Sequence, residues 1–169
     1  MTGTARRLRP HALYLAWVTA LAATLGSLYL SEIVGLVPCV LCWFQRIFMY
    51  PLAVILGIAA YRGDEGVAPY SLALAGIGGS ISLYHYLLQK LPALHGTGLC
   101  TGGVPCSEPY LNLFGFVTIP FMALVAFAAV AALSWVVMLP VPGHGSRAGT
   151  GLDGAEAAEP GTAGERVQR

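Results

Sequence analysis

Four long stretches of apolar residues constrain the fold of this chain more than any other feature of its sequence. They cover residues 12–30, 43–61, 69–88 and 114–139. Because an α-helix rises about 1.5 Å per residue, roughly 20 apolar residues are needed to cross the hydrocarbon core of a bilayer. Each stretch is long enough to do so. We therefore predict an all-α membrane protein, built as a bundle of four transmembrane helices.

The composition supports a membrane protein and argues against a nucleic-acid-binding one. Hydrophobic residues make up 56% of the 169 residues, charged residues make up only 10%, and the mean hydropathy is +0.69. A typical soluble domain has about 25% charged residues. The formal net charge is only +1, and the charges lie near the chain ends and in short connections. The sequence thus offers no basic face for nucleic acid, and we expect membrane lipid to surround the helices.

The first apolar stretch is interpreted as a transmembrane helix rather than as a cleaved signal peptide. Arg6, Arg7 and Arg9 precede it, as basic residues precede the apolar region of a signal peptide. That apolar region is usually shorter, however, at roughly 7 to 15 residues. The Ala-x-Ala sequence at residues 20–22 falls in the middle of the stretch, where cleavage would make little sense.

The positions of basic residues predict the orientation, because positively charged loops are retained on the cytoplasmic side. With four spans, both termini and the middle loop lie on the same side of the membrane. The arginines on that side are Arg6, Arg7, Arg9, Arg62 and Arg147, whereas Lys90 lies on the other side. Both termini are therefore predicted to be cytoplasmic. All four cysteines then lie outside, where disulfides form and persist.

This topology divides the chain into three parts. Residues 1–11 form a cytoplasmic N-terminal segment, and residues 12–140 form the membrane domain, with an outer loop at about residues 89–113. Beyond residue 140 the sequence is rich in Gly, Ala, Pro and Ser and has few large apolar side chains. Because such a composition does not form a buried core, residues 141–169 are predicted to be a disordered cytoplasmic tail.

The sequence Cys39-Val-Leu-Cys42 follows Pro38 and leads into the second predicted helix. A helix N-terminus stabilises a nearby anion, and Cys-x-x-Cys thiols in such sites have lowered pKa values. We therefore expect a thiolate at Cys42. Arg46 lies four residues later on the same helix face, where its charge would stabilise that thiolate or the oxygen of a reduced quinone. There are two alternatives. The cysteines could bind a structural metal ion, and the Arg46 side chain could simply extend to the membrane–water interface.

A second pair, Cys100 and Cys106, flanks Thr-Gly-Gly-Val-Pro in the predicted outer loop. Gly and Pro let such a short segment fold back to the distance that a disulfide needs. An exposed disulfide of this kind can exchange with a thiol of another protein, or it can simply staple the loop. The cysteines could also ligate zinc. We predict disulfides and no metal, because the outer compartment is oxidising.

His85 lies about one turn from the outer end of the third predicted helix, at a depth similar to that of Cys42 and Arg46. A histidine there could simply bond to backbone or water at the interface. The head group of a membrane quinone also lies near the bilayer surface. We therefore include His85 with Arg46 as a candidate quinone-binding residue.

Two cysteine pairs on one side of a membrane indicate an electron relay. A reduced soluble protein would attack the loop disulfide, the Cys39 and Cys42 disulfide would renew it, and a quinone would reoxidise this last pair. Two alternatives remain open. The cysteines could belong to a non-catalytic membrane protein in which they bind a metal or staple loops, or the relay could run in the reducing direction.

The motifs that carry these residues are similar to those of a known family. They comprise Pro38 to Arg46 with the continuation Ile47 to Pro51, His85 with Leu88 and Gln89, the pair Cys100 and Cys106, and Gly115 to Pro120. Over about residues 12–139 the chain resembles the disulfide bond formation protein B (DsbB) family, and more narrowly its BdbC-like branch. The resemblance implies a four-helix bundle in a bacterial inner or plasma membrane, with its redox cysteines on the extracytoplasmic side.

The resemblance also implies the reaction and the roles of individual residues. Such a protein oxidises a thioredoxin-like, DsbA-like thiol oxidase and passes the electrons to ubiquinone or menaquinone, which supports disulfide formation in exported proteins. Arg46 would lie at the quinone, Cys42 would contact the quinone, and Cys100 would form the mixed disulfide with the partner. The interval from Cys100 to Cys106 is much shorter than in the best-known branch and looks like that of the BdbC-like branch.

Overall fold

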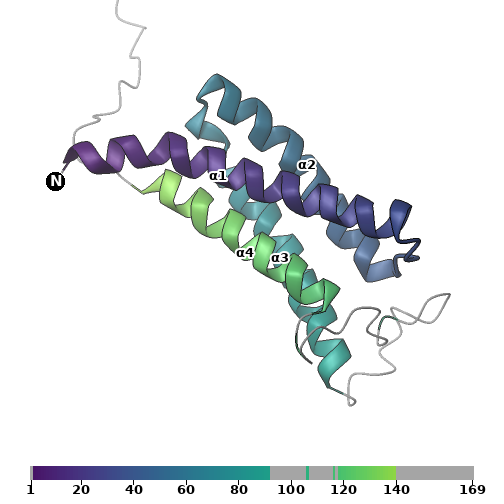
Figure 1. Cartoon of the computed structure of the whole chain (residues 1–169). Helices are drawn as coiled ribbons and strands as arrows, with labels where there is room; N and C mark the ends of the chain where they lie inside the picture. Colours follow the sequence, from purple (N-terminus) through teal and green to yellow (C-terminus); the bar gives the residue numbers. More distant parts are fainter. Residues whose placement is uncertain (1, 92–105, 107–115, 117, 140–169) are drawn as a thin grey trace, which may run out of the picture.

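The computed structural model describes residues 2–91, 106, 116 and 118–139, and every secondary-structure element in these residues is a helix (Figure 1). The long helices are α1 (Thr2–Leu28), α2 (Val40–Arg62), α3 (Ala68–Lys90) and α4 (Ile119–Met138). A π-helix, η1 (Tyr29–Ile33), follows α1, and a 3-10 helix, η2 (Glu65–Val67), precedes α3. The described residues contain four helices long and apolar enough to cross a membrane, as predicted. The compartment that holds the termini stays a prediction.

Two helices begin earlier than the apolar pattern predicts. α1 begins at Thr2 rather than at residue 12. The polar residues before the apolar stretch can continue the helix towards the N-terminus, because Arg and Leu are good helix formers. α2 begins at Val40 rather than at residue 43, because Cys39 is extended and acts as the N-cap of the helix. The earlier start of α2 changes the position of the cysteines relative to the helix end.

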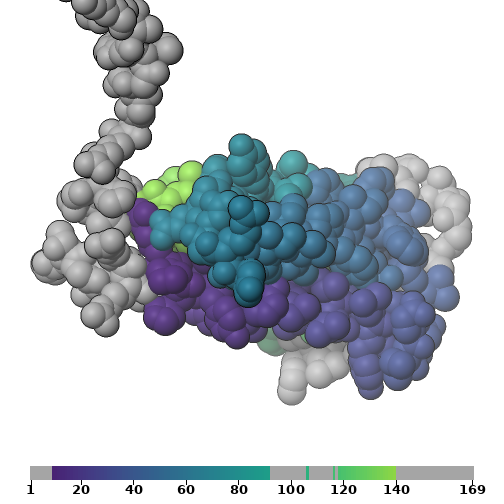
Figure 2. Space-filling view, turned by 90° about the horizontal axis from the view of Figure 1, so that it is seen from above, coloured from purple at the N-terminus to yellow at the C-terminus, as the bar shows by residue number. Residues whose placement is uncertain are grey.

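The four long helices form a closed ring. α1 packs against α2 and α4, α3 packs against the same two helices, and α2 has little contact with α4 (Figure 1). Figure 2 shows the face on which α1, in purple, lies beside α2, in blue. The chain reverses sharply after α2, where Gly63 has a φ of 66° and the Asp64 carboxylate accepts a hydrogen bond from Gly66 N at 2.9 Å. Such a short connection makes α2 and α3 antiparallel neighbours.

Arg9 closes one end of the bundle. Its Nη1 forms an ion pair with Oε2 of Glu65 at 2.8 Å, and its Nη2 donates to the backbone carbonyl of Leu139. These contacts join α1, the turn between α2 and α3, and the end of α4. The cysteine-bearing start of α2 lies at the opposite end. The start of α1, the turn between α2 and α3 and the end of α4 therefore lie together, as the predicted four-span topology requires.

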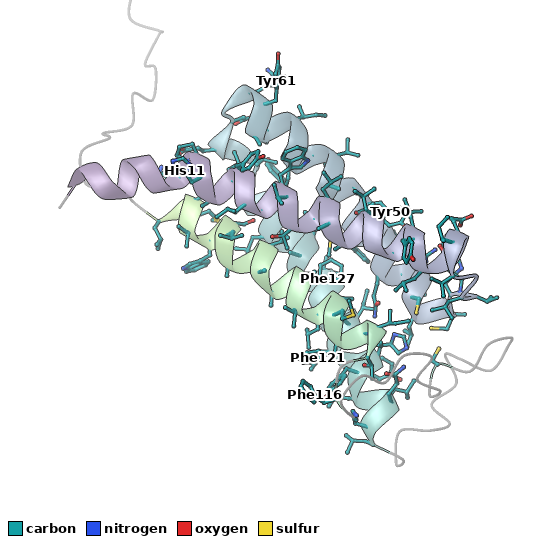
Figure 3. All side chains as sticks on the ribbon, viewed as in Figure 1. His11, Tyr50, Tyr61, Phe116, Phe121 and Phe127 are labelled. Carbon is teal, nitrogen blue, oxygen red and sulfur yellow. The ribbon has the colours of Figure 1, made fainter. Side chains whose placement is uncertain are left out.

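Glycines let neighbouring helices approach closely. A Cβ atom at Gly78 of α3 would lie 2.3 Å from Cε1 of Phe127, a buried side chain of α4 that is labelled in Figure 3. A Cβ at Gly57 of α2 would lie 2.7 Å from Nε1 of Trp17 on α1. Small residues allow such tight packing in lipid. Large apolar side chains that remain exposed, such as Ile77, suit a surface that faces the bilayer.

Candidate functional site

Cys39 and Cys42 lie at the N-terminal end of α2. Cys39 has an extended backbone, with φ −70° and ψ 172°, and is the N-cap residue, so the helix begins at Val40. Its carbonyl accepts the first helical hydrogen bond, from Trp43 N at 3.1 Å. Both cysteines are free thiols, and their sulfur atoms are 3.1 Å apart. The Cys-x-x-Cys spacing therefore puts one sulfur at the cap and the other inside the first turn.

The neighbours of Cys39 favour its thiolate. The hydrogen bond with the Cys42 thiol lowers the pKa of Cys39 to about 4, burial opposes this lowering, and the hydrogen bond with His85 adds to it. Cys39 also lies at the positive end of the α2 dipole. The sequence pattern predicted a thiolate at Cys42, with the helix beginning at about residue 43. The structure favours the thiolate at Cys39 instead, because the hydrogen bonds with Cys42 and His85 both lower the pKa of Cys39.

A buried histidine and a buried amide lie beside Cys39. His85 of α3 is 1% exposed, and its Nε2 lies 3.7 Å from Cys39 Sγ. Its other ring nitrogen, Nδ1, lies 3.1 Å from Nε2 of Gln45 on α2. Gln45 was not among the predicted site residues. An amide in the first turns of a membrane-spanning helix was the signal for it, because such groups are usually hydrogen-bonded inside the bundle.

Cys106, the described cysteine of the outer loop, joins this group. It is buried and disulfide-bonded. Its Sγ, the Sγ of Cys39 and a ring nitrogen of His85 all lie within 4.8 Å of one another. Gln89 of α3 donates from Nε2 to the carbonyl of Cys106 at 3.5 Å, which helps to hold the loop cysteine over the helix pair. Cys100, the other predicted residue of the loop, lies outside the described residues.

Arg46 lies on another side of α2, against α1. Its Nε donates to the hydroxyl of Ser27 at 2.9 Å, and its Nη2 donates to the carbonyl of the same residue at 3.0 Å. The guanidinium carbon also lies 5.5 Å from the ring centroid of Trp43. These contacts hold a positive charge near the cysteine-bearing end of the bundle. Ser27 is a second residue that the sequence analysis did not select, since no local pattern links it to Arg46.

A cavity of about 860 Å³ lies between α1, α2 and α4. Its walls are mostly apolar and include Tyr50 of α2 and Phe121 of α4, both labelled in Figure 3. The start of α2 contributes polar groups to the wall: Cys42, Gln45 and Arg46. A mainly apolar cavity with a few polar groups is typical of a site for a small apolar ligand.

The structure brings most of the predicted site residues together but divides them between two sides of α2. Cys39, His85 and Cys106 lie on the side of α3. Arg46 lies on the side of α1, at the cavity. Cys42 belongs to both groups, because it touches Cys39 and lines the cavity. His85 is not among the described residues that line the cavity, and its predicted contact with a quinone stays a prediction.

Comparison with known proteins gives the family. Residues 9–137 match the sequence model of the family described as "Disulfide bond formation protein DsbB". The chain is 59% identical over 115 residues to the disulfide bond formation protein C of Bacillus subtilis, and the aligned region covers 68% of this chain and 83% of the relative. It is 54% identical over 128 residues to the probable disulfide formation protein C 1 of Bacillus anthracis, and the aligned region covers 76% of this chain and 92% of the relative.

Similarity extends beyond Bacillus. A probable disulfide formation protein of Coxiella burnetii is 49% identical over 122 residues, which covers 72% of this chain and 83% of the relative. No solved structure matches the chain. The resemblance seen in the sequence motifs is confirmed, and the chain belongs to the DsbB family, with Bacillus disulfide formation proteins C among its relatives.

Proposed function

We propose that the protein is a membrane thiol:quinone oxidoreductase. It reoxidises a thioredoxin-like thiol oxidase outside the cytoplasm and passes the electrons to a membrane quinone, ubiquinone or menaquinone, so that disulfides can form in exported proteins. One arrangement carries the proposal. Cys39 Sγ lies within 4.8 Å of Sγ of the disulfide-bonded Cys106 and 3.1 Å from Cys42 Sγ, and Cys42 lines an apolar cavity. The sulfur atoms thus form a path from the loop to the interior of the bundle.

The first part of the relay is exchange between the partner and the loop. A thiolate of the reduced partner attacks the loop disulfide, forms a mixed disulfide and releases a loop thiolate. The second thiolate of the partner attacks the mixed disulfide, and the partner leaves oxidised. Two electrons have then moved to the loop, whose cysteines are both reduced.

The second part moves these electrons to the helix pair. Cys106, as a thiolate, attacks the Cys39–Cys42 disulfide at Cys39, the nearer sulfur, and Cys42 is released. The other loop thiolate then attacks Cys106, which restores the loop disulfide and releases Cys39. The product has free Cys39 and Cys42 thiols and a restored loop disulfide.

The cavity fits the quinone that the last part of the relay requires. Its apolar walls suit an isoprenoid tail, while Cys42 and Arg46 offer a thiol and a positive charge to the polar ring. A bound quinone supplies an acceptor for two electrons and two protons, and the Cys39–Cys42 disulfide forms again. Ser27 holds the guanidinium of Arg46 at the cavity wall. A charge that is already in place stabilises a developing anion without reorganisation.

The proposal includes an orientation: both termini in the cytoplasm and the cysteines outside. The arginines of the N-terminal segment support it, since basic segments stay inside. Arg9 lies at the end of the bundle opposite the cysteines. The disulfide at Cys106 supports it too, because disulfides persist in oxidising compartments. The same compartment favours flow from the partner to the quinone over flow in the reducing direction.

A metal site is the second candidate, and the same cluster favours it. Thiolate sulfur and imidazole nitrogen are the ligands that zinc prefers, and Cys39, His85 and Cys106 bring such atoms within 4.8 Å of one another. Cys106 could ligate a metal only after its disulfide had been reduced. Metal analysis and a non-reducing mass measurement of the purified protein separate the candidates. Bound zinc with four free thiols would favour the metal site over the relay.

The relay is tested with the purified full chain in detergent, a short-chain quinone and a reduced thioredoxin-like protein, by following the loss of quinone absorbance. Turnover should require all three components and should disappear in Cys39→Ser. The matched control is Ser80→Ala, which changes an exposed serine of α3 and should turn over normally. Absence of turnover with both ubiquinone and menaquinone analogues, or full turnover of Cys39→Ser, would contradict the proposal.

A further inference from the structure

Gln45 and His85 are the two buried polar side chains, among the described residues, that are not hydroxyls. They form a chain of contacts that ends at a redox sulfur. Nε2 of Gln45 lies 3.1 Å from Nδ1 of His85, and Nε2 of His85 lies 3.7 Å from Cys39 Sγ. A buried amide needs a hydrogen-bond partner. Here the partner is the ring nitrogen that determines what His85 presents to the cysteine.

The direction of the first hydrogen bond determines where the histidine proton lies. The amide nitrogen of Gln45 can only donate, so Nδ1 of His85 accepts and does not carry the ring proton. A neutral imidazole then carries its proton on Nε2. This is the nitrogen that faces Cys39 Sγ.

We propose that Gln45 is a positioning residue that holds His85 in the Nε2–H tautomer, so that His85 donates a hydrogen bond to Cys39 and favours its thiolate. The inference rests on the proposed function and deepens it, because it gives His85 a role at the thiol rather than at the quinone. In the opposite tautomer Nε2 would present a lone pair to Cys39 and would act as a base. In the proposed tautomer Nε2 already carries a proton and acts as a donor, so the thiol proton leaves to the surroundings.

Among the residues that the structure describes, the other titratable groups of this cluster are Cys42 of α2, Tyr84 of α3 and Cys106 of the loop, and the Arg46 charge lies on another side of α2. The hydrogen bond with Cys42 and the hydrogen bond with His85 both lower the pKa of Cys39. Arg46 points to α1, and Cys106 does not titrate in its disulfide. Among the described neighbours of Cys39, His85 is the one whose effect on the thiol depends on the buried amide of Gln45.

The tautomer can be read from the nitrogen shifts of the full chain labelled with isotopic histidine in detergent. The chain has four histidines, so the variant His85→Asn identifies the signals of His85. In the neutral form of the His85 ring we expect the proton on Nε2, and a mixture of tautomers in Gln45→Met. A wild-type proton on Nδ1 would overturn the inference, and so would an unchanged tautomer in Gln45→Met.

The consequence for the thiol is read from alkylation. The rate at Cys39 in the fully reduced protein is followed against pH by fragment mass spectrometry. Loss of the amide donor in Gln45→Met should move the pH midpoint of alkylation upward by roughly half a unit to one unit. The matched control is Ser134→Ala, which removes another buried hydrogen bond, to Ser71 at 2.8 Å, and should leave the midpoint unchanged.

Each outcome of these measurements is informative. A wild-type midpoint in Gln45→Met would overturn the inference, as would an equal shift in the Ser134→Ala control. If Gln45→Met fails to fold, the tautomer of the wild-type protein still decides. Neither measurement contains a quinone or a partner protein, so a failure here is distinguishable from a failure of turnover.

Discussion

The two sides of α2 at its cysteine-bearing end carry different parts of the site. The thiol side, which faces α3 and the loop, comprises Cys39, Gln45, His85 and Cys106. The cavity side, which faces α1 and α4, comprises Arg46 and Ser27. Cys42 and Gln45 belong to both sides, because each contacts the thiol group and also lines the cavity. On the thiol side the groups are buried, the ligand atoms of Cys39, His85 and Cys106 lie within 4.8 Å of one another, and Gln45 hydrogen-bonds to His85. On the cavity side one tethered charge lies beside about 860 Å³ of space.

This difference matches two kinds of chemistry. Exchange between sulfur atoms requires the attacking and attacked atoms to be in line, so a close, hydrogen-bonded cluster suits it. Exchange of a lipid-soluble carrier requires room. Gln45 and Arg46 are adjacent in sequence and both line the cavity, yet their polar groups bond to different helices, Gln45 to His85 of α3 and Arg46 to Ser27 of α1. The reason is that successive residues of an α-helix are about 100° apart around its axis. Cys42, which belongs to both sides, is the point where electrons would cross.

The largest expected effect comes from breaking the thiol side. Cys39→Ser should lower turnover by roughly three orders of magnitude or more, because a hydroxyl cannot take part in disulfide exchange. Quinone binding, measured by fluorescence quenching or equilibrium dialysis, should stay within about twofold of the wild type if the two sides are independent. A loss of quinone binding in this variant would mean that the sides cannot be separated.

Removal of the charge on the cavity side should have the next largest effect. Arg46→Ala should raise the KM for quinone by roughly 10- to 100-fold, since hydrogen bonds to charged groups contribute about 1.5 to 3 kcal/mol. The KM for the partner protein should change little. Arg46→Lys is the graded control, because it keeps the charge but loses the planar fork that Ser27 holds. An effect confined to the partner's KM would refute the assignment of Arg46 to the quinone.

A smaller change on the same side should follow from loosening Arg46. Ser27→Ala removes the hydroxyl that accepts from Nε but leaves the carbonyl that accepts from Nη2. The KM for quinone should rise by roughly two- to tenfold, as expected for one neutral hydrogen-bond partner. Ser80→Ala removes a serine hydroxyl outside the site and should leave the KM as it is. An equal rise in both variants would show that the effect is not specific to Arg46.

The smallest expected change tests the thiolate on the thiol side. Since the pKa of Cys39 is lowered to about 4, the thiolate is nearly complete above that value and is lost as the pH falls through it. Lowering the pH from about 7 to about 5 should therefore slow alkylation of Cys39 by only about a tenth. A thiol with an ordinary pKa would slow by roughly 100-fold over the same range. Rates at Cys39 that follow the second pattern would contradict the lowered pKa.

Much of the fold and part of the site could be predicted from local patterns. The number of helices follows from hydropathy, and Cys42 and Arg46 share a helix face because they are four residues apart. The start of α2 was predicted too late. Hydropathy follows composition, whereas the helix start depends on the backbone conformation of Cys39. Gln45 and Ser27 were missed because each bonds to a residue on another helix.

The sequence by itself determined four apolar spans, a Cys-x-x-Cys pair at the start of one of them and a second cysteine pair in a loop, because length, hydropathy and spacing are properties of neighbouring residues. Only the tertiary structure decided which side of α2 carries the thiol group and which side faces the cavity. The rotation of each helix is set by packing, as where Phe127 fills the space at Gly78. That packing brings His85 to Cys39 and Ser27 to Arg46, contacts between residues far apart in the chain that no local pattern contains.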